Sequence, residues 1–292
     1  MDDCVIFAPY EADAVGVLDT ISGEFSTVSL QGQVQGEWKF WGAAAVGDHV
    51  YFAPFCADVI GVFDMSAREF STLSLKGQVA DGFKFTGAIA VDKSVYFVPF
   101  CADVVGVLDT ESGEFSTISL QGKVSGNGKF VGAALVNNQL IFAPRDADVV
   151  GVVDLKVGEF STLSLQGKVS GEDKFRGCAA VGDRYVYFAP CAATAVGVLD
   201  TSSGEFSTIF VRVQSQVSGD WKFDGAVAVG DDHVVFVPGH AEVVGVVDTR
   251  SREFSTMSLG DKVSGGDKFS GGVAVGNHVY FAPCRADVVG VL

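Results

Sequence analysis

A repeat of about 45 residues runs through the chain and limits what it can fold into. The dipeptide Lys-Phe recurs at intervals of 45, 45, 45, 48 and 46 residues, with its lysine at Lys39, Lys84, Lys129, Lys174, Lys222 and Lys268. The tripeptide Phe-(Ala/Val)-Pro recurs at a matching spacing, with its phenylalanine at Phe7, Phe52, Phe97, Phe142, Phe188, Phe236 and Phe281. A unit this short cannot bury both of its own faces, so the copies must pack against one another.

Each repeat is predicted to hold four short strands. In the second copy they span residues 42–46, 50–54, 59–64 and 69–75, and they are rich in β-branched and aromatic residues. The motif Asp-Thr-x-Ser-Gly-Glu, as at residues 109–114, is typical of a hairpin turn between the third and fourth strands. No segment shows sustained helical periodicity. The sequence therefore predicts an all-β chain.

Four short strands repeated every 45 residues or so predict the blades of a β-propeller. The stretch "VYFAP…VVGVLDT.SGEFSTISL" resembles the repeats of YVTN-type and kelch-type propellers along the whole chain. The kelch double glycine is replaced by Ala-Pro, and the tryptophan of that family is replaced by Phe25, Phe70, Phe115, Phe160, Phe206 and Phe254. The resemblance implies the architecture and no single activity, since both groups include enzymes and non-enzymes.

The strand pattern predicts one propeller domain over residues 1–292. The chain opens with strands two to four of one blade, continues through five complete blades, and closes with strands one to three of another. Seven blades use every strand. Six blades would leave about 15 C-terminal residues over, so we expect seven. Because the chain begins in mid-repeat, it is also consistent with a fragment of a longer protein.

The composition disfavours several classes of partner. The net charge of −16 repels nucleic-acid phosphates and anionic lipid, so neither partner is expected. No run of 18 apolar residues exists, which predicts a soluble chain without membrane insertion. The start shows no signal-peptide pattern, which favours the cytoplasm. The six cysteines form no CxxC pair, so free thiols are expected, and no cofactor is expected.

Residues identical in every copy are predicted to be structural, whereas positions that vary are free for function. The loop after the proline varies most, reading Tyr10-Glu11, Phe55-Cys56, Phe100-Cys101, Arg145-Asp146, Cys191-Ala192, Gly239-His240 and Cys284-Arg285. The residues just before and just after Lys-Phe also vary. These positions share one face of a propeller, and their aromatic and charged side chains are typical of recognition surfaces. The predicted binding residues are Tyr10, Trp38, Trp41, Phe55, Phe100, Arg145, Arg176, Trp221, His240 and Arg285.

An acidic residue recurs at the start of the third strand and has two interpretations. It is found at Asp13, Asp58, Asp103, Asp148 and Asp287. Carboxylates could hold Ca²⁺, but one acid per blade leaves them too far apart to share an ion. We therefore expect ion pairs with the repeated lysine rather than a metal site. Cys56 and Cys101, at equivalent loop positions, are the remaining candidates, for a soft metal.

A catalytic site is the alternative to a binding surface. His49, His233 and His278 fall in the same turn on the opposite face, so only His240 lies in a variable loop. With Asp224 and Asp146 it could form an acid–base cluster near Arg145 and Arg176. No nucleophile elbow, phosphate loop or zinc motif accompanies it.

The sequence favours a non-enzymatic scaffold that binds a protein or glycan through its variable loops. A propeller hydrolase or lyase centred on His240 and Asp224 is the first alternative. A purely structural repeat protein, self-associating through its incomplete terminal blades, is the second.

Overall fold

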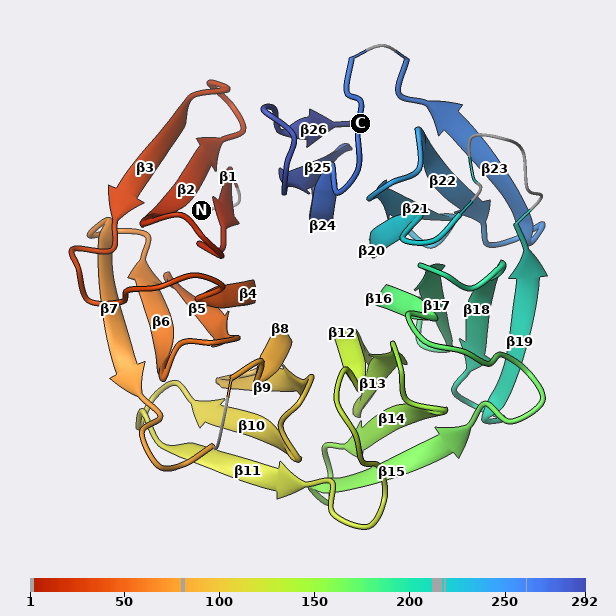
Figure 1. Cartoon of the computed structure of the whole chain (residues 1–292), viewed down its shortest axis with the longest axis horizontal. Coiled ribbons are helices and arrows are strands. Elements are labelled where there is room, and N and C mark those ends of the chain that lie inside the picture. The colour runs from red at the N-terminus through yellow and green to blue at the C-terminus, as the bar shows by residue number, and fades with distance from the viewer. Residues whose placement is uncertain (1–2, 80–81, 212–216, 218, 261) are drawn as a thin grey trace. The chain divides into compact units, whose positions relative to one another are not determined.

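A computed structural model describes residues 3–79, 82–211, 217, 219–260 and 262–292. Its regular elements are all β-strands, 26 of them in the described part of the chain (Figure 1). None of the described residues belongs to a helix with the length and apolar character that a membrane crossing requires. The strands form seven antiparallel sheets, and the fold is a seven-bladed β-propeller. The prediction of seven blades rather than six is confirmed.

The chain divides into two compact units, residues 1–129 and 130–292. The first unit holds blades 1 to 3, coloured red to yellow in Figure 1. Blade 1 is β1 (Cys4–Phe7), β2 (Ala14–Asp19) and β3 (Phe25–Ser29). Blade 2 is β4 (Phe40–Val46), β5 (His49–Pro54), β6 (Val59–Asp64) and β7 (Glu69–Ser74). Blade 3 is β8 (Phe85–Val91), β9 (Ser94–Pro99), β10 (Val104–Asp109) and β11 (Phe115–Ser119).

The second unit holds blades 4 to 7. Blade 4 is β12 (Phe130–Val136), β13 (Gln139–Pro144), β14 (Val149–Asp154) and β15 (Glu159–Ser164). Blade 5 is β16 (Phe175–Val181), β17 (Tyr185–Pro190), β18 (Ala195–Asp200) and β19 (Glu205–Phe210). Blade 6 is β20 (Phe223–Val229), β21 (His233–Pro238), β22 (Val243–Asp248) and β23 (Glu253–Ser258). Blade 7 is β24 (Phe269–Val275), β25 (His278–Pro283) and β26 (Gly290–Val291).

The first strand of a blade contains a glycine that lets it touch the first strand of the next. In β4 the pairing with β5 shifts register between Phe40 and Ala43, and Gly42 between them has φ +83°. A Cβ on Gly42 would lie 3.0 Å from the Cα of Gly87 in β8. In the second unit a Cβ on Gly177 would lie 2.8 Å from the Cα of Gly225. The glycine is thus required by its backbone conformation and by the close approach of the neighbouring strand.

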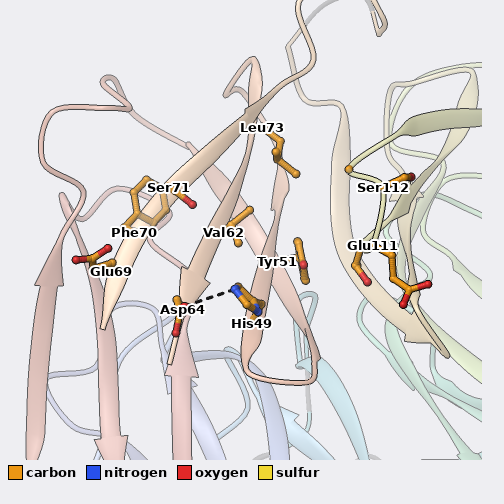
Figure 2. Close-up of a pocket in the computed structure, with 12 residues that line it drawn as sticks. His49, Tyr51, Val62, Asp64, Glu69, Phe70, Ser71, Leu73, Glu111 and Ser112 are labelled. Atoms are coloured by element: carbon orange, nitrogen blue, oxygen red, sulfur yellow. Dashed lines mark ion pairs between the residues drawn. The ribbon is translucent and has the colours of Figure 1, made fainter. Parts of the chain in front are cut away.

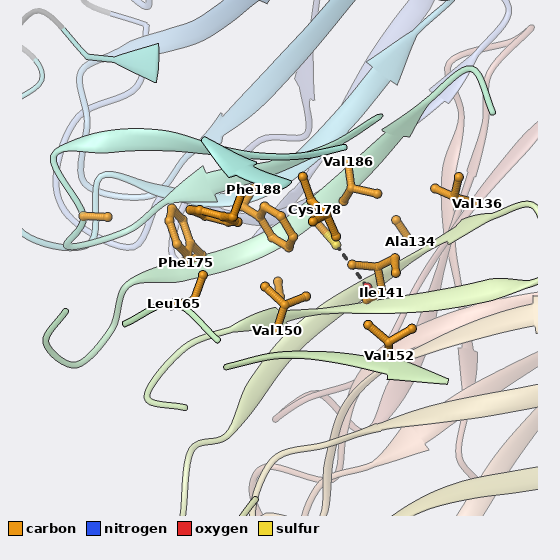
Figure 3. Close-up of a cluster of buried hydrophobic side chains, with 14 residues drawn as sticks. Ala134, Val136, Ile141, Val150, Val152, Leu165, Phe175, Cys178, Val186 and Phe188 are labelled. Atoms are coloured by element: carbon orange, nitrogen blue, oxygen red, sulfur yellow. Dashed lines mark hydrogen bonds between the residues drawn. The ribbon is translucent and has the colours of Figure 1, made fainter. Parts of the chain in front are cut away.

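Apolar side chains fill the space between consecutive blades. In the second unit Val150 and Val152 of blade 4 pack against Phe175 and Phe188 of blade 5 (Figure 3). Within a blade, three phenylalanine rings surround the glycine of the third strand. Around Gly61 they are Phe40, Phe52 and Phe70, with ring centroids 5.8–6.3 Å apart. The repeated phenylalanines of blade 2 are therefore core residues, whereas the copy at Phe25 in blade 1 is 53% exposed.

The repeated lysine joins one blade to the blade before it. The Lys39 side chain is only 1% exposed, yet its ammonium group donates to the carbonyls of Glu11 and Gly36, both at 2.8 Å. Asp13, in the loop between β1 and β2, lies 3.2 Å from the same nitrogen. These three acceptors match the three hydrogens of an ammonium group, which offsets the cost of burying it.

The expected pairs between the lysine and the acid of the third strand form between consecutive blades. They join Lys39 to Asp13, Lys84 to Asp58, Lys129 to Asp103 and Lys174 to Asp148, at 3.0–3.3 Å. The acids are 78–89% exposed, so the backbone carbonyls carry more of the stabilisation than the ion pair does. Lys222 supports this, since Thr194 stands at the acid's position and the lysine still binds the carbonyls of Ala192 and Gly219.

Replacing a buried lysine should cost far more than replacing its acid. Lys174→Met leaves the carbonyls of Asp146 and Gly171 without their charged donor, so the free energy of unfolding should fall by about 2–4 kcal/mol. Asp148→Asn changes an exposed partner and should cost less than about 1 kcal/mol. Urea denaturation followed by fluorescence measures both. Equal losses would mean that the ion pair, and not the carbonyls, stabilises the junction.

The glycine of the first strand should not tolerate a methyl group. Gly177→Ala introduces both a left-handed alanine and a contact of 2.8 Å with backbone, so a loss of more than about 3 kcal/mol is expected. Gly182→Ala is the matched control, because Gly182 has φ +55° and open space around it. That variant should lose only about 1 kcal/mol in the same measurement.

Candidate functional site

The variable residues gather at one end of the blades, which we call the loop face. It comprises the loops between the second and third strands and the segments that lead into the first strands. Antiparallel pairing places both at the same end of each sheet. The repeated lysine fixes them there: in the first unit the Lys84 N–H donates to Phe55, and the Lys84 carbonyl accepts from Phe100 and Ala102. The loop face is therefore held by backbone hydrogen bonds on both sides of a buried residue.

The residue before each of these lysines has a left-handed backbone. Its φ lies between +49° and +64° in all six copies, which are Trp38, Phe83, Gly128, Asp173, Trp221 and Asp267. Glycine and aspartate adopt this conformation readily, whereas a bulky aromatic residue does so at a cost of about 1–2 kcal/mol. Trp38, Phe83 and Trp221 are nonetheless 39–41% exposed. Three copies thus hold an exposed aromatic ring in a strained conformation.

The first unit carries an aromatic cluster, formed by Tyr10, Trp38, Trp41, Phe55, Phe83 and Phe100. Neighbouring rings have centroids 5.0–6.4 Å apart. Phe55, one of the predicted binding residues, lies at its centre and is only 3% exposed, so its ring offers almost no surface to a ligand. Tyr10, Trp41 and Phe100 are half-buried around it. Phe55 supports the other rings from within.

Trp38 and Phe83 are the most exposed rings of the aromatic cluster. Their rings lie 5.7 Å apart at an interplanar angle of 35°. The Trp38 indole N–H donates to the Glu11 carboxylate at 3.0 Å, which fixes the orientation of the ring. Two exposed and pre-oriented rings are the kind of surface on which a ligand's apolar face or aliphatic chain can pack with little loss of side-chain entropy.

The second unit carries an ionic network instead, formed by Arg145, Asp146, Asp173, Arg176 and Asp224. Arg145 contacts Asp146 at 2.5 Å and Asp173 at 2.6 Å. Arg176 lies 3.6 Å from Asp173 and 3.2 Å from Asp224. The five side chains are only 15–23% exposed. Arg145 and Arg176 were predicted as binding residues, and the structure shows that both are also engaged in holding blades 4 to 6 together.

His240 and its neighbours lie at the edge of this network. Its imidazole Nε2 lies 3.0 Å from Asp267, and the exposed Arg285 lies 3.6 Å from the same carboxylate. The Trp221 ring packs edge-on against His240 with centroids 5.3 Å apart, and its indole N–H donates to Asp173 at 3.4 Å. Trp221 therefore links His240 to the ionic network.

The acid–base cluster considered as the alternative site is only partly assembled. Asp146 and Asp224 are paired with arginines, and the carboxylate beside His240 is Asp267 rather than Asp224. Burial raises the pKa of Asp224 above its ordinary value, and the Arg176 guanidinium opposes that rise. Sequence reasoning missed Asp173 and Asp267. The feature that could have identified them is the variable position before Lys-Phe. They share this position with Trp38, Phe83 and Trp221 of the other repeats.

Most of the metal candidates are engaged in other contacts. Four of the five repeated acids pair with a lysine, as described, and Asp287 is exposed. In the part of the chain that the structure describes, no group of three or more His, Cys, Asp or Glu side chains is placed to hold a metal ion. Cys56 and Cys101 are free thiols, and burial raises the pKa of Cys191 to about 12.

Comparison with known proteins places the chain among propellers. No protein-family model matches the sequence, and no curated protein is significantly similar to it. Among solved structures, virginiamycin B lyase from Staphylococcus aureus superimposes with a TM-score of 0.77 at 15% identity, over 100% of this chain and 95% of that one. A catalytically inactive histidine-to-alanine variant of that lyase, solved with quinupristin, gives 0.76 at 15% identity, over 99% and 95%.

Propellers that are not lyases superimpose comparably well. The WD40 repeats of RRP9 give a TM-score of 0.72 at 10% identity, over 96% of this chain and 84% of that one. YCF48 bound to D1 peptide gives 0.71 at 8% identity, over 97% and 86%. Identities this low establish the fold alone, and the fold hosts both enzymes and non-enzymes.

Asp173 should be the most sensitive carboxylate of the ionic network. Asp173→Asn keeps the shape and tolerates the left-handed backbone, but two arginines that are 15–18% exposed lose a shared charge. The free energy of unfolding should fall by about 1–3 kcal/mol. Glu172→Gln, the exposed neighbour, should change it by less than about 0.5 kcal/mol. Denaturant titration of the two variants compares them, and similar values would contradict a structural role for the network.

Proposed function

We propose that this protein is a binding module that takes a protein ligand on its loop face, with the aromatic cluster as its main contact. The observation that carries the proposal is the strained and exposed aromatic residue before the repeated lysine, at Trp38, Phe83 and Trp221. Strain of this kind persists where function maintains it.

The chain itself contains the unstrained alternative. Gly128, Asp173 and Asp267 occupy the equivalent position with the same backbone conformation, and residues of those types fit it at little cost. Replacing tryptophan by one of them would relieve strain and remove an exposed apolar surface. The retention of Trp38 beside Phe83 is therefore best explained by contact with a ligand.

The chemistry of this surface suits a protein ligand. Tryptophan and phenylalanine are enriched in protein–protein contacts, and tryptophan is among the residues that most often supply the binding energy. Among the structural neighbours, YCF48 was solved with a bound D1 peptide and is an example of a propeller with a peptide ligand. A glycan could also stack on the two rings, and the experiment below separates the two classes.

The aromatic cluster should be essential for binding and dispensable for stability. Ligands would first be selected from a random peptide phage library and, in parallel, from a glycan array. Trp38→Gly combined with Phe83→Gly should weaken the selected peptides by at least about tenfold. The free energy of unfolding should change by less than about 1 kcal/mol per substitution, because relief of the left-handed strain offsets the lost ring packing.

A control on the other end of the blades separates this effect from general stickiness. Ile21 is 77% exposed in the turn between β2 and β3, so Ile21→Ser removes apolar surface away from the loop face. That variant should bind the selected peptides as the parent does. Peptides that bind the double-glycine variant undiminished would contradict the proposal, and selection of glycans alone would reassign the ligand class.

A lyase or hydrolase centred on His240 is the second candidate. It rests on the His240–Asp267 contact of 3.0 Å, in a fold whose superimposable lyase has an inactive histidine variant. Quinupristin, the compound solved with that variant, is the substrate to try, with its loss followed by chromatography. Turnover that disappears in His240→Ala would support this candidate. Turnover retained in that variant, or none in the parent protein, would remove it.

Two further hypotheses stay predictions. Self-association would use the three-stranded sheets of blades 1 and 7, and sedimentation at increasing concentration would reveal it. A purely structural role would be indicated if neither peptides nor glycans were selected.

A further inference from the structure

A cavity of about 430 Å³ opens between blades 2 and 3 of the first unit, at the end opposite the loop face (Figure 2). Blade 2 contributes His49, Tyr51, Asp64 and Glu69, together with an apolar wall of Val62, Phe70 and Leu73. Blade 3 contributes its outer hairpin turn, residues 110–113. The volume is within the range of ordinary ligand sites. Because the blades are repeats, the same groove can be compared from one pair of blades to another.

One turn position that borders the groove differs between the copies of the repeat. The fifth residue of the hairpin turn is glycine in most copies, at Gly23, Gly113, Gly158 and Gly204. It is arginine in blades 2 and 6, at Arg68 and Arg252. All of these residues have φ between +55° and +73°, so the arginines adopt a backbone conformation that suits glycine. The two copies that depart from glycine therefore accept strain to place a long cationic side chain there.

Arg68 occupies the groove between blades 1 and 2. Its guanidinium donates to the Ser26 hydroxyl of β3 at 2.8 Å. Ser26 is the equivalent of Ser71, which lines the open groove of blades 2 and 3. Beside Arg68 a cavity of only about 230 Å³ is left, lined among others by Cys4, Ile6 and Val17, the equivalents of His49, Tyr51 and Val62. The arginine thus takes up part of the space that is open one blade further on.

Arg252 occupies the equivalent groove of blades 5 and 6 in the second unit. Its guanidinium lies over the Tyr185 ring, 5.3 Å from the centroid. Tyr185 pairs with Asp200 as His49 pairs with Asp64, so Tyr185 is the counterpart of His49. Burial raises the pKa of the next tyrosine, Tyr187, and the positive charge of Arg252 opposes that rise. A guanidinium therefore fits this groove in two independent copies of the repeat.

We propose that the open groove between blades 2 and 3 binds an arginine side chain supplied by a partner protein. Gly113 stands where Arg68 and Arg252 stand in the occupied grooves, and a Cβ built on it would meet nothing within 4 Å. The groove between blades 2 and 3 therefore has the equivalent lining positions, but the chain places no arginine side chain of its own from this turn. The two occupied grooves identify the chemical class of the ligand.

The charges around the groove favour a cation. Asp64, Glu69 and Glu111 line it, with His49 3.5 Å from Asp64 and Lys93 paired to Glu111. Three carboxylates outnumber the one ammonium group, and Figure 2 shows Asp64, Glu69 and Glu111 on the two sides of the opening. By analogy with Arg252 over Tyr185, the incoming guanidinium stacks on His49 above Tyr51, and its aliphatic stem lies along Phe70 and Leu73.

This inference does not depend on the function proposed for the loop face. The groove and the aromatic cluster lie at opposite ends of the same blades, so a partner could use either one alone. Substitutions in one are expected to leave the other unchanged, which allows the two proposals to fail separately.

The test uses three blocked tripeptides, acetyl-Gly-X-Gly-amide with X as arginine, citrulline or lysine. Binding to the full chain would be followed by NMR through the ring signals of His49 and Tyr51. The arginine peptide should shift both signals with an affinity in the millimolar range, as expected for one side chain. The citrulline peptide, which has the same shape without the charge, should bind at least about tenfold more weakly, a difference of about 1.4 kcal/mol. Stronger binding by the lysine peptide would overturn the choice of guanidinium.

The matched variants fill the groove or leave it open at the same net charge. Gly113→Arg should abolish binding of the arginine peptide, because the chain then supplies its own guanidinium as it does at Arg68. Gly204→Arg adds the same charge at the equivalent position of blade 5 and should leave binding unchanged. Thermal melts confirm that both variants fold. Binding retained in folded Gly113→Arg, or lost equally in Gly204→Arg, would show nonspecific attraction to an acidic protein and overturn the proposal.

Discussion

The buried lysine of each repeat is the interaction on which the rest of the structure depends. Its ammonium group reaches back to carbonyls of the preceding blade, and its own backbone pairs with the loops on either side. An ammonium group with 1% exposure is tolerated only because its hydrogens are satisfied in a fixed geometry. That geometry sets the position of both loops that it joins. The residues next to the lysine can then vary without moving the blades.

The two units use this freedom in different ways. In the first, the variable positions around the lysines hold aromatic rings, and in the second they hold paired arginines and aspartates. The ionic network satisfies its own charges, so it stabilises the blades that it joins. The rings around Trp38 and Phe83 leave apolar surface open to solvent in a conformation that costs energy. Only the exposed rings of the first unit are difficult to explain without a ligand.

Much of the fold could be predicted from the sequence, because each repeat shows the same pattern of strand, turn and core residues and so supports the same prediction independently. The strands, the seven blades and the lysine–aspartate pairs all follow from residues that recur at fixed spacing. The burial of Phe55 and the pairing of His240 with Asp267 could not be predicted in the same way. Both depend on how far one blade is displaced from the next, which no single repeat encodes. The left-handed backbone at Trp38 could not be predicted either, because tryptophan rarely adopts this conformation.

The choice between glycine and arginine in the outer hairpin turn has a genetic consequence. Glycine and arginine codons differ by a single nucleotide, and this turn accepts either residue with the same backbone. A point mutation can therefore convert an occupied groove into an open one, or close it again, while the strands around it stay as they are. Each repeat copy carries this switch separately, so duplication of a blade followed by one base change would be enough to add a site to the protein or to silence one.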